Sequence, residues 1–236
     1  MFHQHFNTIG STQVYLKDNL DKLKINENDI LISCSEQTEG IGRRGNVWDT
    51  YPNSLAMSFT LKPNIVTTLT PLEIGLMAIS YFHKKFNSSL FLKWPNDILT
   101  KDGRKCGGIL CQYIDNNTVI VGLGANLGKI NSPVTDSMYK HGLGNIHPDL
   151  ELKNFDQERI SKELYQEFLE NRYHDVSSLV NDFNKHCFHL NMDVFIHESG
   201  KDYIGVFKGI GKNGEAIVEI DSTIRSFLSS SLTILN

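Results

Sequence analysis

The segment 54–61 places the strongest constraint on how this chain folds. Its sequence, SLAMSFTL, is apolar on both faces of an extended strand, so neither face suits contact with water. Such a strand belongs in the middle of a sheet that is covered on both sides. The chain has 236 residues, 40% of them hydrophobic, which suffices for one large core or for one core and a small second domain.

Local signals predict helices that can cover this strand. Ser11 is a typical N-cap for a helix that runs to Leu20, and the run Thr70-Pro71-Leu72-Glu73 has the pattern of a capping box. Amphipathic periodicity predicts two further helices over 155–172 and 176–187. Strands are expected over 29–35, 54–61, 90–93, 106–114 and 119–123, the last three as antiparallel neighbours, and residues 129–149 are expected to form a long loop.

The apolar pattern changes near residue 190. From Val194 to Ile234 the apolar residues alternate with polar ones, and turn sequences such as Ser199-Gly200 separate the runs. We therefore expect a main domain of residues 1–190 and a small β-barrel domain of residues 191–236. The predicted fold is α/β (α+β), with a mixed, largely antiparallel central sheet flanked by helices.

Composition argues against several classes of protein. Lys and Arg number 23 against 27 Asp and Glu, and a net charge of −4 does not favour a nucleic-acid partner. No apolar run approaches the roughly 18 residues that span a bilayer, and the start lacks signal-peptide features, so we expect a cytoplasmic protein without a membrane partner. The four cysteines lack Cys-x-x-Cys spacing, and the pair His186 and His189 has no third ligand block, so no metal site is predicted.

Four segments concentrate residues that can bind a ligand. Residues 39–48 (EGIGRRGNVW) combine three glycines with Arg43 and Arg44, whose guanidinium groups can fork onto phosphate oxygens. The segment follows a strand but precedes no helix, so it matches neither the Walker loop nor the dinucleotide fingerprint. Taken alone, it is equally well explained as a flexible surface loop.

The other three segments lie in or at the ends of strands. Residues 93–97 (KWPND) bring a cation, an aromatic ring, an amide and a carboxylate to the mouth of a strand. Residues 104–110 (RKCGGIL) place a lysine before two glycines, which permit close approach, and residues 122–126 (GLGAN) end a strand with glycines and an amide. Each segment alone has an ordinary explanation as a turn, a bulge or a strand end.

In this order and spacing, the segments resemble the biotin protein ligase family in its monofunctional form. The catalytic domain of that family carries Gly-Arg-Gly-Arg-Arg-Gly, Lys-Trp-Pro-Asn-Asp, Lys-x-x-Gly-Ile-Leu and Gly-x-Asn blocks. The resemblance begins at Gly10-Ser11-Thr12 and covers nearly the whole chain, and residues 93–97 are its most specific block. The chain departs from the family at Ile41 and Asn46, where the family's loop has arginines, and at Gln13, where asparagine is usual.

The resemblance implies a class II synthetase-like fold with an SH3-like C-terminal domain and a reaction in two steps. Biotin and ATP would form biotinyl-adenylate and pyrophosphate, and the biotinyl group would then pass to a lysine of a biotin carboxyl carrier protein. That carrier would belong to acetyl-CoA carboxylase or to another biotin-dependent carboxylase. Mg²⁺ would be held largely by the triphosphate rather than by a protein metal site. The resemblance leaves open whether the protein is a monomer or a homodimer.

The same resemblance implies roles for residues at the matching positions. Lys105 and Arg43 would hold the biotin carboxylate and the α-phosphate, and Asp97 would orient the incoming amine or accept its proton. The expected biotin-binding residues are Ser11, Thr12, Gln37, Gly40, Gly42, Arg43, Lys105 and Gly108, and the expected nucleotide-binding residues are Arg43, Arg44, Trp48, Lys93, Asn96 and Asn126.

Two other interpretations stay open. A lipoate or octanoate protein ligase shares the fold and the carrier-lysine chemistry but lacks the loop of residues 39–48 and the KWPND block. A non-catalytic biotin or adenylate sensor is conceivable because of Ile41 and Asn46, and an assay with ATP and a carrier separates it from a ligase. We expect no DNA-binding module before Ser11, because a helix-turn-helix domain needs several tens of residues.

Overall fold

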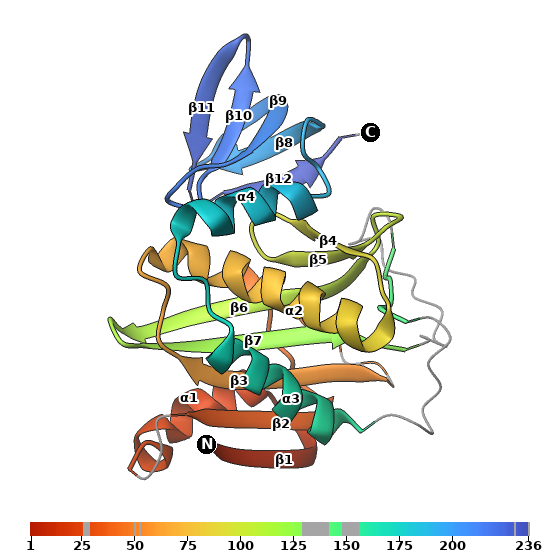
Figure 1. The fold of residues 1–236 in the computed structure, drawn as a ribbon, viewed down its shortest axis with the longest axis vertical. Coiled ribbons are helices and arrows are strands. Elements are labelled where there is room, and N and C mark those ends of the chain that lie inside the picture. Colours follow the sequence, from red (N-terminus) through yellow and green to blue (C-terminus); the bar gives the residue numbers. More distant parts are fainter. Residues whose placement is uncertain are drawn as a thin grey trace.

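Two β-sheets form the framework of the protein (Figure 1). The computed structural model describes residues 1–25, 29–49, 51, 53–128, 142–147, 156–228 and 230–235. The larger sheet has seven strands in the order β1-β2-β3-β7-β6-β5-β4, and among them β1 and β2 run parallel while the other pairs are antiparallel. These strands are β1 (Phe2–Ile9), β2 (Ile30–Gln37), β3 (Ser54–Leu61), β4 (Leu90–Lys93), β5 (Asp97–Thr100), β6 (Lys105–Asp115) and β7 (Thr118–Asn126).

Strand β3 lies inside the sheet, between β2 and β7, and all of its residues are buried. Because successive side chains of a strand point to opposite faces, the neighbouring β2 contributes to two cores. Ile30 and Ile32 pack with helix α1 (Thr12–Leu23) on one face, whereas Leu31 belongs to the larger core on the other face. Helices α2 (Thr70–Phe86) and α3 (Gln157–Glu170) cover that second face (Figure 1). The predicted mixed sheet flanked by helices is therefore confirmed.

The predicted start of α1 is confirmed, and the predicted capping box of α2 is wrong. The Ser11 hydroxyl accepts a hydrogen bond from the backbone N–H of Val14. In α2 the N-cap is Leu69, and the Thr70 hydroxyl accepts a bond from the N–H of Asn64 instead of capping its own helix. Glu73 is fully buried and turned away from the helix start, because the Arg172 guanidinium and the Asn64 amide bond its carboxylate.

Strands β1 and β5 were not predicted from the sequence. Because β5 lies between β4 and β6, the prediction that 90–93 and 106–114 are neighbours is wrong. Polar residues interrupt the apolar pattern of β1 because it is an edge strand of the sheet. The ring nitrogens of His3 and His5 both lie within hydrogen-bond distance of the Ser33 hydroxyl, at 2.8 and 2.9 Å. Burial lowers the pKa of His3 to about 4, so the ring is neutral at pH 7.

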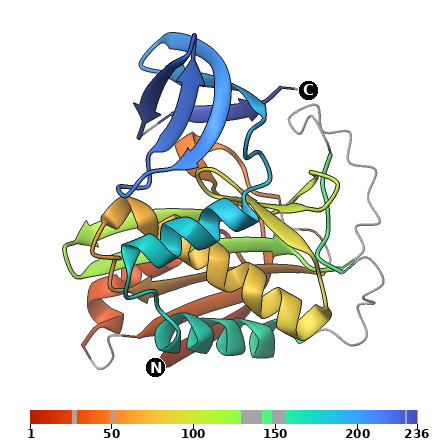
Figure 2. The same ribbon diagram turned by 45° about the horizontal axis from the view of Figure 1, so that its top comes forward.

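The smaller sheet lies beyond helix α4 (Val176–His186), which packs between α2 and this sheet (Figure 1, Figure 2). It is antiparallel, as expected for residues after 190, and its apolar side chains join the core of the larger sheet. His189 is fully buried there with its ring centroid 4.2 Å from that of Phe207, whereas His186 is exposed. The boundary at residue 190 stays a prediction. The strands are β8 (Asp193–Glu198), β9 (Lys201–Ile210), β10 (Ala216–Ile220), β11 (Thr223–Phe227) and β12 (Ser231–Ile234).

The predicted long loop over 129–149 falls mostly outside the described residues. Within residues 142–147, Leu143 bridges to Lys105, and the N–H of Gly144 donates to the carbonyl of Lys105 at 2.8 Å. In the described part of the chain, no helix is long and apolar enough to cross a membrane.

The buried Glu73 carboxylate makes its partner Arg172 important for stability. Replacing Arg172 with alanine leaves a charge buried without its bidentate partner, and we expect a loss of about 3–5 kcal/mol in the free energy of unfolding. Chemical denaturation of the two proteins measures this difference in the free energy of unfolding. The matched control is Arg159→Ala, which removes an exposed arginine from its pair with Glu163 and leaves the denaturation midpoint nearly unchanged. Equal midpoints for wild type and Arg172→Ala would contradict this role.

Candidate functional site

The register of the larger sheet brings distant parts of the sequence into one row. Lys93 lies opposite Asp97, Asp97 opposite Gly108, Gly108 opposite Gly124, and Gly124 opposite Ala56. Directly opposed residues share a face of the sheet, so two charged side chains stand at one end of a row whose other members have little or no side chain. A flat group can therefore lie on the backbone beside the charged side chains.

Gly108 and Gly124 must be glycines because the ring of Trp48 lies directly on their backbone. A Cβ atom on Gly124 would stand 2.3 Å from Cε2 of the Trp48 ring, and one on Gly108 would stand 3.2 Å from Cζ3. The loop of residues 40–48 carries the ring there as a small hairpin, in which the N–H of Trp48 donates to the carbonyl of Gly40. Gly108 and Gly124, together with Gly122 on the next row, form what we call the glycine strip.

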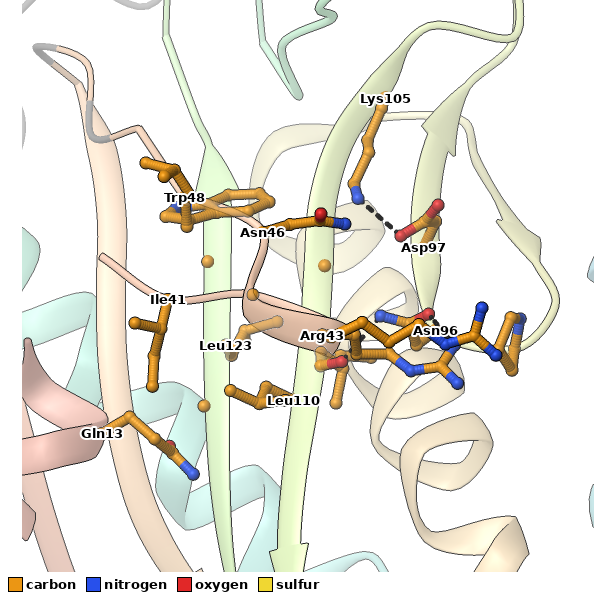
Figure 3. Close-up of a pocket in the computed structure, with 18 of the residues that line it drawn as sticks. Gln13, Ile41, Arg43, Asn46, Trp48, Asn96, Asp97, Lys105, Leu110 and Leu123 are labelled. Atoms are coloured by element: carbon orange, nitrogen blue, oxygen red, sulfur yellow. Dashed lines mark hydrogen bonds and ion pairs between the residues drawn. The ribbon is translucent and has the colours of Figure 1, made fainter. Parts of the chain in front are cut away.

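A carboxylate between two ammonium groups forms the charged end of the site (Figure 3). The Nζ of Lys105 lies 2.7 Å from Oδ1 of Asp97, and the Nζ of Lys93 lies 3.7 Å from Oδ2. Burial lowers the pKa of Lys93 from its ordinary value, and the neighbouring Asp97 opposes this shift. Lys105 also lies 5.6 Å from the ring centroid of Trp48. Asp97 thus holds both cations, and the Nζ of Lys105 would lie 3.6 Å from a Cβ atom on Gly108 of the strip.

An amide holds Arg43 at the same end. The Nη1 of Arg43 donates to Oδ1 of Asn96 at 2.9 Å, and Nδ2 of Asn96 donates to the carbonyl of Ile109 at 2.8 Å. Burial lowers the pKa of Arg43, but a guanidinium stays charged at any physiological pH. With Arg44, four cations line the pocket, and Asp97 is the single carboxylate that the described residues contribute to it. This end of the site is suited to anions.

The other end of the pocket adjoins the start of α1, and its polar side chains are uncharged. Thr12 donates to Oε1 of Gln37 both from its backbone N–H, at 2.8 Å, and from its hydroxyl, at 3.0 Å. The Thr12 hydroxyl also lies 2.9 Å from that of Ser58. Figure 3 shows Ile41 and Leu110 between this end and the charged end. The cavity has a volume of about 290 Å³, enough for a compact ring system with a short tail.

Most of the predicted site residues line this one pocket. They are Ser11, Thr12, Gln37, Gly42, Arg43, Arg44, Trp48, Lys93, Asn96, Asp97, Lys105 and Gly108, and the divergent positions Gln13, Ile41 and Asn46 line it as well.

Two of the predicted residues lie beside the pocket rather than in its lining. Gly40 stands at the base of the loop, where its carbonyl accepts from Trp48. Asn126 borders a smaller adjoining cavity with Trp48 and Asp49, and its amide is bonded to Ser54 and Gly144. Their roles in ligand binding stay predictions.

Some lining residues were not found from the sequence. Strand alternation places Ser58 and Gly122 on the face of the pocket, but only the register shows that they are partners. Residues 230–232, from the C-terminal sheet and the residue before β12, also reach the pocket, and no motif marks them. A further link to that sheet comes from Trp94, whose Nε1 donates to the carbonyl of Gly214 at 2.9 Å. The C-terminal sheet therefore completes one wall and supports the KWPND segment.

An uncharged chamber that opens onto clustered cations fits a ligand with an uncharged ring and an anionic group. The model of the biotin/lipoate A/B protein ligase family matches residues 6–126, and the chain belongs to this family. The bifunctional ligase/repressor BirA of Escherichia coli is 24% identical over 240 residues, which cover 96% of this chain and 72% of that protein. The biotin–protein ligase of Schizosaccharomyces pombe is 25% identical over 83% of this chain and 36% of that protein.

Solved structures show the same fold. A biotin protein ligase from Aquifex aeolicus in complex with biotin and ATP superimposes with a TM-score of 0.79 at 22% identity and covers 99% of both chains. The biotin acetyl coenzyme A carboxylase synthetase from Helicobacter pylori with bound biotinylated ATP has a TM-score of 0.67 at 22% identity, over 95% of this chain and 98% of that chain.

The contact between Trp48 and the glycine strip gives a direct test of the loop position. In Gly124→Ala, the new Cβ atom collides with the ring, so Trp48 must leave the strip and its fluorescence emission should shift to longer wavelength. Subtracting the spectrum of the matching Trp48→Phe protein removes the signal of Trp94, the other tryptophan. Gly122→Ala is the control, because its Cβ would contact Gln13 instead. Unchanged Trp48 emission in Gly124→Ala would contradict the contact.

Proposed function

We propose that this chain is an ATP-dependent biotin–protein ligase. In the first step, a carboxylate oxygen of biotin attacks the α-phosphorus of ATP and pyrophosphate leaves. In the second step, the ε-amine of a carrier lysine attacks the carbonyl carbon of biotinyl-adenylate, AMP leaves and the amine loses a proton. The observation that carries the proposal is the cation cluster of Lys105, Lys93 and Arg43 at the mouth of an uncharged chamber. The names of the relatives and the ligands of the solved neighbours support the choice of biotin and ATP.

The first step brings two anions together, and the cations offset their repulsion. Two unit charges at 4 Å repel by about 4 kcal/mol at an effective dielectric constant of 20. Lys105 stands at the boundary between the charged end and the glycine strip, and Arg43 is held at the same end by Asn96. Both would therefore contact the junction of the carboxylate and the α-phosphate, where charge is held before and during the transfer.

The second step needs a neutral amine, and among the described residues Asp97 is the carboxylate that lines the pocket. Its oxygens already contact Lys105 and Lys93, so it is positioned to accept hydrogen bonds from an incoming ammonium and to receive its proton. The ring of Trp48 covers the strip beside it, and a closed loop there would keep water from the adenylate. The proposed partner is the carrier domain of a biotin-dependent carboxylase.

Magnesium would enter with the triphosphate. Among the described residues, no group of three or more His, Cys, Asp and Glu side chains is placed to hold a metal ion. The ion would therefore be held mainly by phosphate oxygens and water, where it neutralises charge on the leaving pyrophosphate.

The function is tested by measuring pyrophosphate release from ATP by the purified chain with biotin, with lipoate and with neither. A biotin carrier domain is then added and examined by mass spectrometry. Biotin-dependent release and a single biotinylated lysine are expected. Release that depends on lipoate would instead assign the chain to the lipoate branch of the family, and tight biotin binding without release would indicate a sensor.

Lys105→Ala should nearly abolish pyrophosphate release, by about 100-fold or more, because it removes a cation at the reacting junction. The control is Lys101→Ala, an exposed lysine at the tip of the β5–β6 hairpin that does not line the pocket. It should leave the rate unchanged. A near-normal rate for Lys105→Ala in a folded protein would remove Lys105 from the mechanism.

Asp97→Asn should slow the transfer of biotin from preformed adenylate to the carrier by about 100-fold at neutral pH, because an amide cannot accept the proton. Single-turnover mixing of enzyme, adenylate and carrier measures this step without the first one. Raising the pH should recover part of the rate, since more of the attacking lysine is then neutral. A transfer rate equal to that of wild type would show that Asp97 takes no part in it.

A further inference from the structure

Gln13 presents a polar atom without a partner among the described residues, at the uncharged end of the pocket. Its side chain projects from the first turn of α1 and is 3% exposed. The Nε2 group donates to the carbonyl of Ile120 at 3.3 Å, while Oε1 has no hydrogen-bond partner among the described residues. A buried amide oxygen without a partner is costly, so its retention at a pocket wall points to a ligand.

The orientation of this amide is fixed by its surroundings. A flipped amide would place two oxygens, Oε1 and the Ile120 carbonyl, against each other, so Nε2 must face Ile120. On the pocket side, a Cβ atom on Gly122 would stand 2.8 Å from Oε1, and only glycine leaves that space open. Figure 3 shows the amide below Ile41 and beside Leu110, at the end away from Lys105 and Asp97.

The other polar side chains at this end are already engaged as acceptors. Oε1 of Gln37 receives two hydrogen bonds from Thr12, and the Thr12 hydroxyl is shared with Ser58. The Ser11 hydroxyl accepts from the backbone of α1. A ligand that fills the chamber must therefore offer an N–H or O–H group to Gln13, or leave its oxygen buried without a partner.

We propose that Gln13 is a specificity residue that accepts a hydrogen bond from an N–H group of the ligand's cyclic urea. The inference rests on the proposed function and deepens it. The bicyclic ring of biotin has two urea N–H groups, so one of them can pair with Oε1 while Ile41 and Leu110 contact its apolar surface. The dithiolane ring of lipoate has no hydrogen-bond donor and would leave Gln13 unpaired. Gln13 thereby favours the cyclic urea over the other acid that this family uses.

Isothermal titration calorimetry without ATP tests the proposal with three ligands: biotin, desthiobiotin, which keeps the cyclic urea, and lipoate. Gln13→Met keeps the volume and removes the acceptor. We expect this substitution to lower the affinities for biotin and desthiobiotin by about the same factor, roughly 10- to 100-fold. The affinity for lipoate should not fall. The control Gln112→Met replaces a half-buried glutamine of β6 that does not line the pocket, and all affinities should stay unchanged.

The outcomes separate this inference from the proposed function. Biotin affinity within twofold of wild type in Gln13→Met would overturn the role of Gln13 and leave the ligase proposal intact. A wild-type protein that binds lipoate and not biotin would overturn the proposed function itself. If Gln13→Met does not fold, wild type is titrated with biotin methylated at each urea nitrogen in turn. One of the two should bind at least tenfold more weakly than biotin, and equal affinity for all three would contradict the proposal.

Discussion

The register of the antiparallel strands β3, β7, β6 and β5 is the constraint on which the site depends. It sets Gly124 opposite both Gly108 and Ala56, and it sets Asp97 opposite Gly108. A slip of one residue would turn every side chain to the other face of the sheet and place bulky residues where the strip must be open. The buried β3 resists such a slip, because both of its faces are packed. The strand register therefore determines both the stability of the sheet and the shape of the site.

The charged groups lie at one end of the pocket only, and this determines the orientation in which a ligand binds. The ion pair of Lys105 and Asp97 stands at one end, while the Gln13 amide stands at the other, with apolar side chains between them. A ligand with an apolar ring and an acidic tail fits this arrangement in one orientation, with its carboxylate against the cations. Loop closure by Trp48 and support from the C-terminal sheet through Trp94 act on the charged end.

The parts of this picture that depend on local pattern could be predicted from the sequence. The apolar run of β3 indicated a central strand, and the motifs at 39–48, 93–97 and 104–110 indicated most of the lining. Interactions between distant residues could not be predicted in this way. The capping-box pattern at Thr70 was misleading because Glu73 pairs with Arg172, far along the chain. Gln13 was noted only as a departure from the family, since its unpaired oxygen is visible only once Ile120 and Gly122 are placed beside it.

The most direct test of the account is a crystal structure of the chain with a non-hydrolysable biotinyl-adenylate analogue. The account predicts that the linkage between the acyl group and the phosphate contacts Lys105 and Arg43, and that the urea ring lies against Gln13. An analogue bound in the opposite direction, with its adenine beside Gln13 and its urea ring beside Lys93, would contradict it.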